Sequence, residues 1–490
     1  MKKYILSRII KSIIALFVVL SIVIVMLFTL IPRENIFKND TSIQRMKGDE
    51  KTSYMYSKWD ELGYLDYLTF NEMCRISSDD VNACIAGDTE ESTKILQEYE
   101  NKGYVIKQFN NGSHYGYYEY SPFEVLANFY SGFISIDNPN KIVDSDNPDL
   151  ERKYYVDSDQ NGVPAIMCSG CEYKYQVYFD GNFPFIHQNI IKLDFGTSYP
   201  TKVGIPTMNV IADGQGNAKL VEQTFPTGST QSSPLDQHSC RYKPTSTLDR
   251  LDTTKFTDNY ANCNSLYDSP SMISTSLLFG LVSLFIAYLI AIPAGIYMAR
   301  KKGKFADKLG IVYINFLIAV PSLAFIFFVK QIGQSFGLPD KFPHFGFGDI
   351  RSYILPILIL ALLNTSSLMM WTRRYMIDQS NADYVKFARA KGLSEKEIFN
   401  RHILKNAIIP IVNQIPVSIV MCISGSVITE TVFAIPGMGK MLPDSINMLN
   451  NNMVITLTFI FTGLSVFAVL VGDLLMTAID PRIKLTEKGE

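Results

Sequence analysis

The sequence predicts an α-helical polytopic membrane protein with six transmembrane helices and a large mixed α+β domain inserted between the first two. Long apolar runs occur near the N-terminus and again from residue 271 onward, whereas the stretch between them is polar. Lysine and arginine cluster at alternate ends of these runs, as in multi-pass membrane proteins. The net charge of the 490 residues is only -2, so we expect no nucleic-acid partner, which would require a basic face.

The first apolar run extends from Ile9 to Ile31 and is long enough to span a bilayer core of about 30 Å. A cleaved signal peptide would have a shorter apolar core that ends at small residues, whereas this run ends at Leu30, Ile31 and Pro32. We therefore expect residues 1–31 to form a cytoplasmic N-terminus and a retained transmembrane helix.

Five further apolar runs are each near or above the length of about 20 residues that a spanning helix needs. We expect them to form helices two to six, at residues 271–299, 309–336, 353–371, 408–433 and 454–479. Basic residues precede the first helix, follow the sixth, and fill the connections between helices two and three and between helices four and five. Because such residues stay on the cytoplasmic side of short loops, we expect a plasma-membrane protein with both termini in the cytoplasm.

This topology places residues 32–270 outside the cytoplasm. The segment is too long to be a simple connector, and the alternation from Tyr173 to Phe179 predicts a strand that ends in a turn at Asp180 to Asn182. We expect an extracytoplasmic domain here. Residues 271–482 would then form the membrane core with a cytoplasmic loop at 374–407, followed by a cytoplasmic tail at 483–490.

Six of the seven cysteines lie in the predicted outer domain, where disulfides are possible. Proximity in the sequence favours three pairs, Cys74–Cys84, Cys168–Cys171 and Cys240–Cys263. Free thiols or a metal site are the alternatives for Cys168 and Cys171. A redox motif would need a thioredoxin-like βαβ context and a zinc site would need a second ligand pair, neither of which is recognisable, so we predict no metal site.

No phosphate-binding GxxxxGK[ST] loop occurs in the sequence, and its five histidines are scattered. We therefore expect no nucleotide site of this type, no cofactor and no catalytic residue in this chain.

The most informative segment lies in the predicted cytoplasmic loop and consists of Asp383, Tyr384, Val385, Lys386, Phe387, Ala388, Arg389, Ala390, Lys391 and Gly392. These residues favour a short helix that stops at the glycine. The spacing of Tyr384, Phe387 and Ala388 predicts one apolar ridge, with basic residues beside it. Such a helix could seat in a groove of another protein or lie on anionic lipid headgroups, and these residues alone do not decide between the two.

The segment resembles the cytoplasmic loop of ABC importer permeases, in the form found in dipeptide and oligopeptide permeases. The similar residues are Tyr384, Val385, Ala388 to Leu393, His402, Leu404, Asn406, Ala407 and Pro410. The Glu-Ala-Ala triplet of importers at large is replaced by Lys386, Phe387 and Ala388. Three further stretches are similar to the peptide branch, namely Leu193 to Ser198, Glu430 to Gly439 and Asp480 to Arg482. The enlarged outer domain is similar to that of streptococcal AmiC-type permeases, and the composition suits a low-GC Gram-positive source.

This resemblance implies an ABC importer permease fold and a role in oligopeptide import. It implies a homologous second permease subunit, two ABC ATPase subunits that bind ATP and magnesium, an extracellular peptide-binding lipoprotein and a peptide substrate. It also implies that residues 383–392 form the contact with an ATPase subunit.

Polar residues within the predicted spans are candidates to line a translocation path, namely Asn364, Asn413, Gln414 and Asp473. Hydrogen bonding between helices is the alternative role for each. Two other functions stay open at this point. One is the permease of a related nickel importer, and the other is a receptor-like membrane protein whose outer domain binds a ligand.

Overall fold

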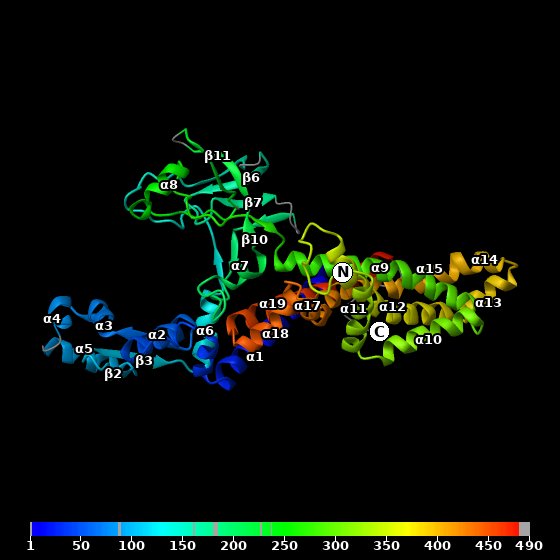
Figure 1. Cartoon of the computed structure of the whole chain (residues 1–490), viewed down its shortest axis with the longest axis horizontal. Helices are drawn as coiled ribbons and strands as arrows, with labels where there is room; N and C mark the ends of the chain where they lie inside the picture. The colour runs from blue at the N-terminus through cyan, green and yellow to red at the C-terminus, as the bar shows by residue number, and fades with distance from the viewer. Residues whose placement is uncertain are drawn as a thin grey trace.

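The computed structural model describes residues 2–86, 90–159, 162–179, 185–225, 228–236 and 238–479. The predicted turn at 180–182, the element at 480–482 and the tail at 483–490 lie outside these ranges. Figure 1 shows an elongated molecule, with a bundle of long helices at one end and two separate lobes at the other.

Five described helices are each long and apolar enough to cross a membrane, at Leu6–Leu30, Met272–Arg300, Arg351–Ser380, Glu395–Met421 and Asn451–Ala478. A sixth span would be the pair α10 (Phe305–Ala319) and α11 (Ser322–Ser335), which are bent by 108° relative to each other. Pro321 lies at the break, where its ring prevents a regular helix from continuing. The prediction of apolar spanning helices is confirmed, but the third is not straight and the fifth begins earlier than residue 408.

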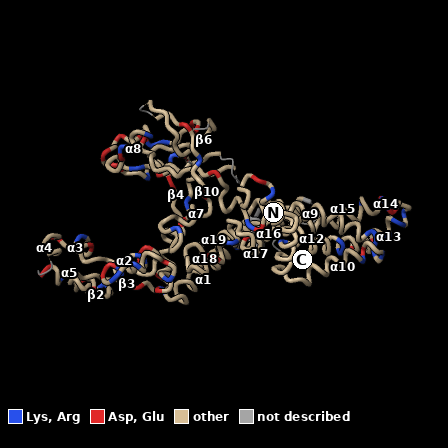
Figure 2. Tube along the Cα trace, in the orientation of Figure 1, with Lys and Arg blue, Asp and Glu red and all other residues tan. Residues whose placement is uncertain are grey.

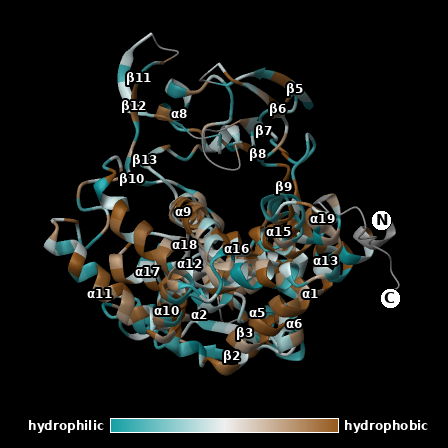
Figure 3. Ribbon diagram, turned by 90° about the vertical axis from the view of Figure 1, so that its right-hand side faces the viewer, coloured by the Kyte–Doolittle hydropathy of each residue, from teal (hydrophilic) through white to brown (hydrophobic). Residues whose placement is uncertain are grey.

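The remaining helical segments of the bundle are short and connect or extend the spans. Outside the bent pair, the described helical segments of the bundle, long and short, are α1 (Lys2–Leu30), α9 (Met272–Arg300), α12 (Arg351–Ser380), α13 (Asp383–Ala390), α14 (Glu395–Glu397), a π-helical turn (Ile398–Ile403), α15 (Leu404–Asn413), α16 (Ile415–Gly425), α17 (Val427–Phe433), α18 (Met438–Met448) and α19 (Asn451–Ile479). Lysine and arginine gather around α13 and α14, whereas the middle of the bundle carries few charges (Figure 2). Apolar residues dominate the long helices (Figure 3).

Helices α9 and α12 pack closely because Gly295 has no side chain. A Cβ at this position would lie 2.7 Å from the Cβ of Thr372 and 3.0 Å from the carbonyl oxygen of Met369. Small residues allow such close approach of helices in membranes.

The first lobe follows α1 and has an aromatic core. Its elements are η1 (Arg33–Asn39), α2 (Gly48–Glu61), β1 (Leu65–Thr69), α3 (Phe70–Ser77), α4 (Val81–Ile85), α5 (Glu90–Asn101), β2 (Val105–Gln108) and β3 (His114–Glu119). The strands form an antiparallel sheet in the order β1-β3-β2. Tyr56, Tyr67, Tyr115 and Tyr117 pack together beneath it. A disulfide between Cys74 and Cys84 joins α3 to α4.

The second lobe contains a four-stranded antiparallel sheet in the order β5-β6-β7-β8. Its elements are β5 (Lys153–Ser158), β6 (Pro164–Ser169), β7 (Tyr175–Phe179), β8 (Ile186–Gln188), β10 (Gln215–Ala218), β11 (Leu220–Thr224), β12 (Thr230–Pro234), η2 (Thr245–Thr247), α8 (Arg250–Lys255) and β13 (Tyr267–Ser269). Strands β10–β13 and β11–β12 form two further antiparallel pairs. The strand predicted from Tyr173 to Phe179 is present as β7.

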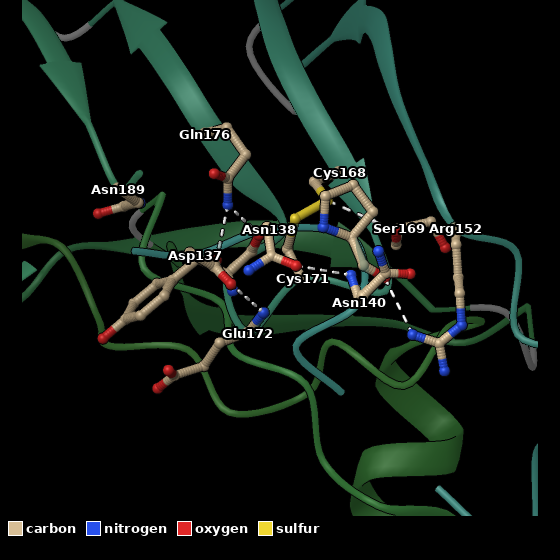
Figure 4. Close-up of a disulfide and its surroundings, with 12 residues drawn as sticks. Asp137, Asn138, Asn140, Arg152, Cys168, Ser169, Cys171, Glu172, Gln176 and Asn189 are labelled. Atoms are coloured by element: carbon tan, nitrogen blue, oxygen red, sulfur yellow. Dashed lines mark hydrogen bonds between the residues drawn. A yellow bond between two sulfur atoms is a disulfide. The ribbon is translucent and has the colours of Figure 1, made fainter. Parts of the chain in front are cut away.

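The Cys168–Cys171 segment forms a disulfide in a tightly anchored turn (Figure 4). The carboxylate of Asp137 accepts hydrogen bonds from the backbone N–H of Glu172 at 2.8 Å and from that of Tyr173 at 2.9 Å. Gly170 has a φ of +84°, and a Cβ there would lie 2.2 Å from the carbonyl oxygen of Pro139. The structure also pairs Cys240 with Cys263. All three pairs are those that proximity in the sequence favours, and the described residues contain no group of metal-ligating side chains.

Four short elements, which we call the collar, hold the lobes against the bundle. They are α6 (Pro122–Gly132), β4 (Ile134–Ile136), β9 (Ile191–Leu193) and α7 (Thr207–Ala212). β4 pairs with β9, and α7 buries Val210 and Ile211 against Met453 and Leu457 of α19.

Three consecutive asparagines at the start of α19 connect the bundle to the segment between β9 and α7 and to the first lobe. Asn450 donates to the hydroxyl of Ser198 at 2.8 Å, and Asn452 donates to the carbonyl of Thr197 at 3.0 Å. Asn451 donates to the hydroxyl of Tyr64 at 2.6 Å. These contacts give a structural reason for the Leu193–Ser198 motif.

A buried carboxylate strengthens the same junction. The hydroxyls of Tyr199 and Tyr54 donate to Asp40 at 2.6 and 2.8 Å, and the N–H of Ser42 donates at 2.8 Å. Burial acts to raise the pKa of Asp40, but these hydrogen bonds outweigh it and hold that pKa below its usual value.

Candidate functional site

The predicted contact helix is present as α13, and its end is set by Gly392. This glycine has a φ of +79°, a conformation that other residues adopt only with strain. Its N–H donates to the carbonyl of Arg389 at 2.9 Å, and the N–H of Leu393 donates to the carbonyl of Ala388 at 3.3 Å. This pair of bonds is the Schellman arrangement that ends many helices.

One face of α13 is buried within the chain itself. Val385 and Ala388 pack with Met376 of α12, Ile398 of the π-helical turn and Ala407 of α15. Tyr384 donates a hydrogen bond to Gln379 at 2.8 Å. The helix is therefore fixed to the ends of two spanning segments and would move with them.

The structure divides the predicted apolar ridge of Tyr384, Phe387 and Ala388 between buried and exposed surface. Ala388 is buried, whereas the side chain of Phe387 is 69% exposed. Adjacent residues of an α-helix differ in direction by about 100°, so a core that covers Val385 and Ala388 can leave Phe387 exposed at its edge. The sequence spacing alone did not show which of the two would pack inside.

Charged pairs surround the exposed Phe387. Lys386 contacts Asp383 at 2.8 Å, and Arg389 contacts Glu395 at 2.7 Å. The Lys386 ammonium holds the pKa of the Asp383 carboxyl below its usual value. An exposed aromatic side chain within a polar rim is the pattern of a protein-binding anchor.

A buried ion pair supports the same end of the bundle. Arg373 of α12 contacts Asp307 of α10 at 2.6 Å, and the N–H of Gly303 donates to the same carboxylate at 2.8 Å. This pair ties the loop between α9 and α10 to α12.

The four path candidates do not form one cluster. Asn364 donates to the carbonyl of Leu360 at 2.9 Å within α12, and Gln414 is exposed. Asn413 packs against Gly472 of α19, next to Asp473, which contacts Arg8 of α1 at 2.9 Å. The Arg8 contact favours a helix–helix role for Asp473, while a path role for each residue stays a prediction.

Glu430 of α17 is a fully buried carboxylate whose role the sequence did not reveal. Its Oε1 accepts hydrogen bonds at 2.7 Å from the hydroxyls of Ser276 on α9 and Ser426. Its Oε2 accepts the backbone N–H of Lys440 in the first turn of α18 at 2.8 Å. The carboxylate thus satisfies the N-terminus of α18, where helix polarity favours a negative charge.

The glycines of this motif make room for the carboxylate. A Cβ on Gly437 would lie 2.5 Å from Oε2 of Glu430, and one on Gly439 would lie 2.9 Å from it. One feature of the sequence could have indicated this role of Glu430: it is an acidic residue in an apolar run, followed by Pro-Gly-Met-Gly.

Comparison with known proteins agrees with this architecture. Residues 291–485 match the family model described as the inner membrane component of binding-protein-dependent transport systems. Over the full length of both chains, the sequence is 42% identical to the oligopeptide transport system permease protein AmiC of Streptococcus pneumoniae. The chain belongs to the family of oligopeptide and dipeptide ABC importer permeases. Members of this family are transport subunits rather than enzymes.

Other relatives of this permease match only part of it. The oligopeptide permease AppB of Bacillus subtilis is 32% identical over 43% of this chain and 70% of its own length. The dipeptide permease DppB of Lactococcus lactis is 30% identical over 44% of this chain and 70% of its own. Among solved structures, a chain of the MetNI methionine ABC transporter covers 42% of this permease, with 14% identity and a TM-score of 0.33.

Proposed function

We propose that this permease forms the translocation path for oligopeptides together with a homologous second permease, above two ATPase subunits. The observation that carries the proposal is the 42% identity to an oligopeptide permease over the whole length of both chains. The sequence has no phosphate-binding loop of the GxxxxGK[ST] type, which is in keeping with ATP and magnesium bound by partner subunits. Helix α13, with Phe387 exposed, is the proposed contact with one of them.

The mechanism follows from how α13 is attached. Because Val385 and Ala388 pack against α12 and α15, a shift of α13 on closure of the ATPases would shift the ends of these segments as a rigid body. Movement of packed helices of this kind is a common way to alternate access to a central path.

We further propose that both termini are cytoplasmic and that the two lobes lie outside the cell, over or beside the entrance of the path. The lobes would dock the peptide-delivering lipoprotein and shield the entrance, without binding peptide tightly themselves.

The outer face of the second lobe supports this docking role. Val156, Ile166 and Val177 oppose one another across three adjacent strands, and Phe179 opposes Ile186 on the next pair. Of these, Val156 is 74% exposed. Exposed contiguous apolar surface on a sheet is typical of an interaction site.

Deletion of the gene should abolish uptake of a radiolabelled oligopeptide by intact cells, and the wild-type gene should restore it. Uptake of nickel ions should not change, because the proposal assigns only peptides to this path. Loss of nickel uptake with normal peptide uptake would replace this proposal by the nickel-importer alternative.

A membrane-impermeant amine reagent added to wall-stripped cells should label Lys94 in the first lobe and Lys153 beside the apolar face, but not Lys386 on α13. All three side chains are at least half exposed, so labelling reports their side of the membrane. Saturating lipoprotein should protect Lys153 more than Lys94. Labelling of Lys386 instead would invert the topology, and equal labelling of Lys153 with and without lipoprotein would remove the docking role.

A further inference from the structure

Helix α6 lies against the middle of α1 rather than beyond its end. The hydroxyl of Tyr130 lies 2.7 Å from Oγ of Ser21 and 3.2 Å from the carbonyl oxygen of Phe17. The rings of Tyr130 and Phe133 contact the ring of Phe17, with centroids 5.4 and 6.2 Å apart. Leu20 and Ile24 of α1 are buried in the same cluster.

Two spanning helices give the same depth for this contact. Ser21 lies nine residues before Leu30, at the end of the apolar span of α1, which corresponds to roughly 13 Å of helix. Phe133 also contacts Phe459 of α19, with ring centroids 5.7 Å apart. Phe459 lies eight residues after the start of that span at Asn451, or roughly 12 Å. In a hydrocarbon core of about 30 Å, both values place the end of α6 within one leaflet.

The exposed residues of α6 and of the β4–β9 ribbon are uncharged, and the charged residues there, Glu124 and Lys192, are half-buried. Phe123, Ala127 and Ser131 recur every four residues on the exposed side of α6, and the side chain of Phe123 is 84% exposed. Ile136 and Ile191 oppose each other across the ribbon and, with Ile134, are more than half exposed.

Most polar side chains of α6 have hydrogen-bond partners, which lowers the cost of placing them in a bilayer, and Ser131 donates to the carbonyl of Asn128. Ser121 and Glu124 form a capping box at its N-terminus, and Tyr130 is hydrogen-bonded to α1. The exposed side of α1 next to it is also apolar, at Val18, Ile22 and Met26.

We propose that α6 is a membrane-embedded element, immersed in the leaflet next to the C-terminal end of α1, with phospholipid acyl chains covering Phe123 and Ile134. The collar would then anchor both lobes in the bilayer in addition to the spanning helices. This placement requires that the chain spans a membrane, but it does not depend on which side the lobes face.

Fluorescence quenching by brominated lipid tests this placement in the assembled transporter, reconstituted in phosphatidylcholine nanodiscs with or without bromine on the acyl chains. The variants are Phe123→Trp and Ile134→Trp, each combined with Trp371→Phe, because Trp371 lies on a spanning helix and is partly exposed. Trp59 is buried in the first lobe and gives the same background in every variant. Leu251→Trp in the same background is the control, since Leu251 is exposed on α8 of the second lobe and outside the proposed docking face.

Brominated lipid should reduce the tryptophan emission of the Phe123→Trp and Ile134→Trp variants. The fraction of emission lost should be at least twice the fraction lost by the control variant. Equal quenching in all three variants would overturn the proposal. Quenching that occurs in the chain alone but disappears in the assembled transporter would also overturn it, because the second permease subunit would then cover this surface. Normal peptide uptake by each variant verifies that it is folded.

Discussion

The substitution Phe387→Asp should abolish peptide uptake and copurification of the ATPase subunits, while the amount of permease in the membrane stays unchanged. Phe387 is an exposed large apolar side chain of α13, and it is not part of the buried cluster that holds this helix. Loss of a central aromatic anchor costs an interface about 2 kcal/mol or more, and about 1.4 kcal/mol already corresponds to a tenfold loss of affinity.

Phe387→Leu is the matched control, because it keeps an apolar side chain of similar size and should keep most of the uptake. Ala388 is a poor test position, since it packs against α12 and α15 and a bulky residue there would also damage the fold. Normal copurification of the ATPases with the Phe387→Asp variant would show that α13 is not the contact.

Replacement of Glu430 by alanine should destabilise the bundle and abolish uptake. The change removes the acceptor that Glu430 gives to the N–H of Lys440 and the hydroxyl of Ser276, and each buried unsatisfied group costs about 1–3 kcal/mol. The loss of stability can be measured as a lower temperature of unfolding of the detergent-solubilised permease.

Glu430→Gln is the matched control, because its amide oxygen still accepts hydrogen bonds in nearly the same volume, so the loss should be clearly smaller. The double variant Glu430→Ala with Ser276→Ala should lose less than the sum of the two single changes, since both remove the same bond. Strict additivity, or an alanine variant as stable as the wild type, would contradict the role given to this carboxylate.

Local patterns in the sequence predicted much of the bundle. Apolar run length identified the spanning helices, and Gly392 identified the end of α13, because both are properties of a single segment. The same holds for the disulfides, which join cysteines separated by 3, 10 and 23 residues.

Contacts between distant segments were beyond such patterns. The hydrogen bond between Asn450 and Ser198 joins residues 252 positions apart, and that between Glu430 and Ser276 joins residues 154 apart. Neither asparagine nor serine carries a local signal for its partner. The two-sided character of α13 was also hidden, because whether Phe387 or Ala388 is buried depends on α12 and α15.

ATP-driven uptake by purified components distinguishes a transport subunit from a receptor. The permease, its second permease subunit, the ATPases and the lipoprotein would be reconstituted in lipid vesicles, and a labelled oligopeptide supplied on the lipoprotein side. We expect peptide to accumulate only when ATP is present, and we expect no accumulation with the Phe387→Asp variant. Tight binding of free peptide by the permease lobes without any ATP-dependent accumulation would contradict it and favour a receptor.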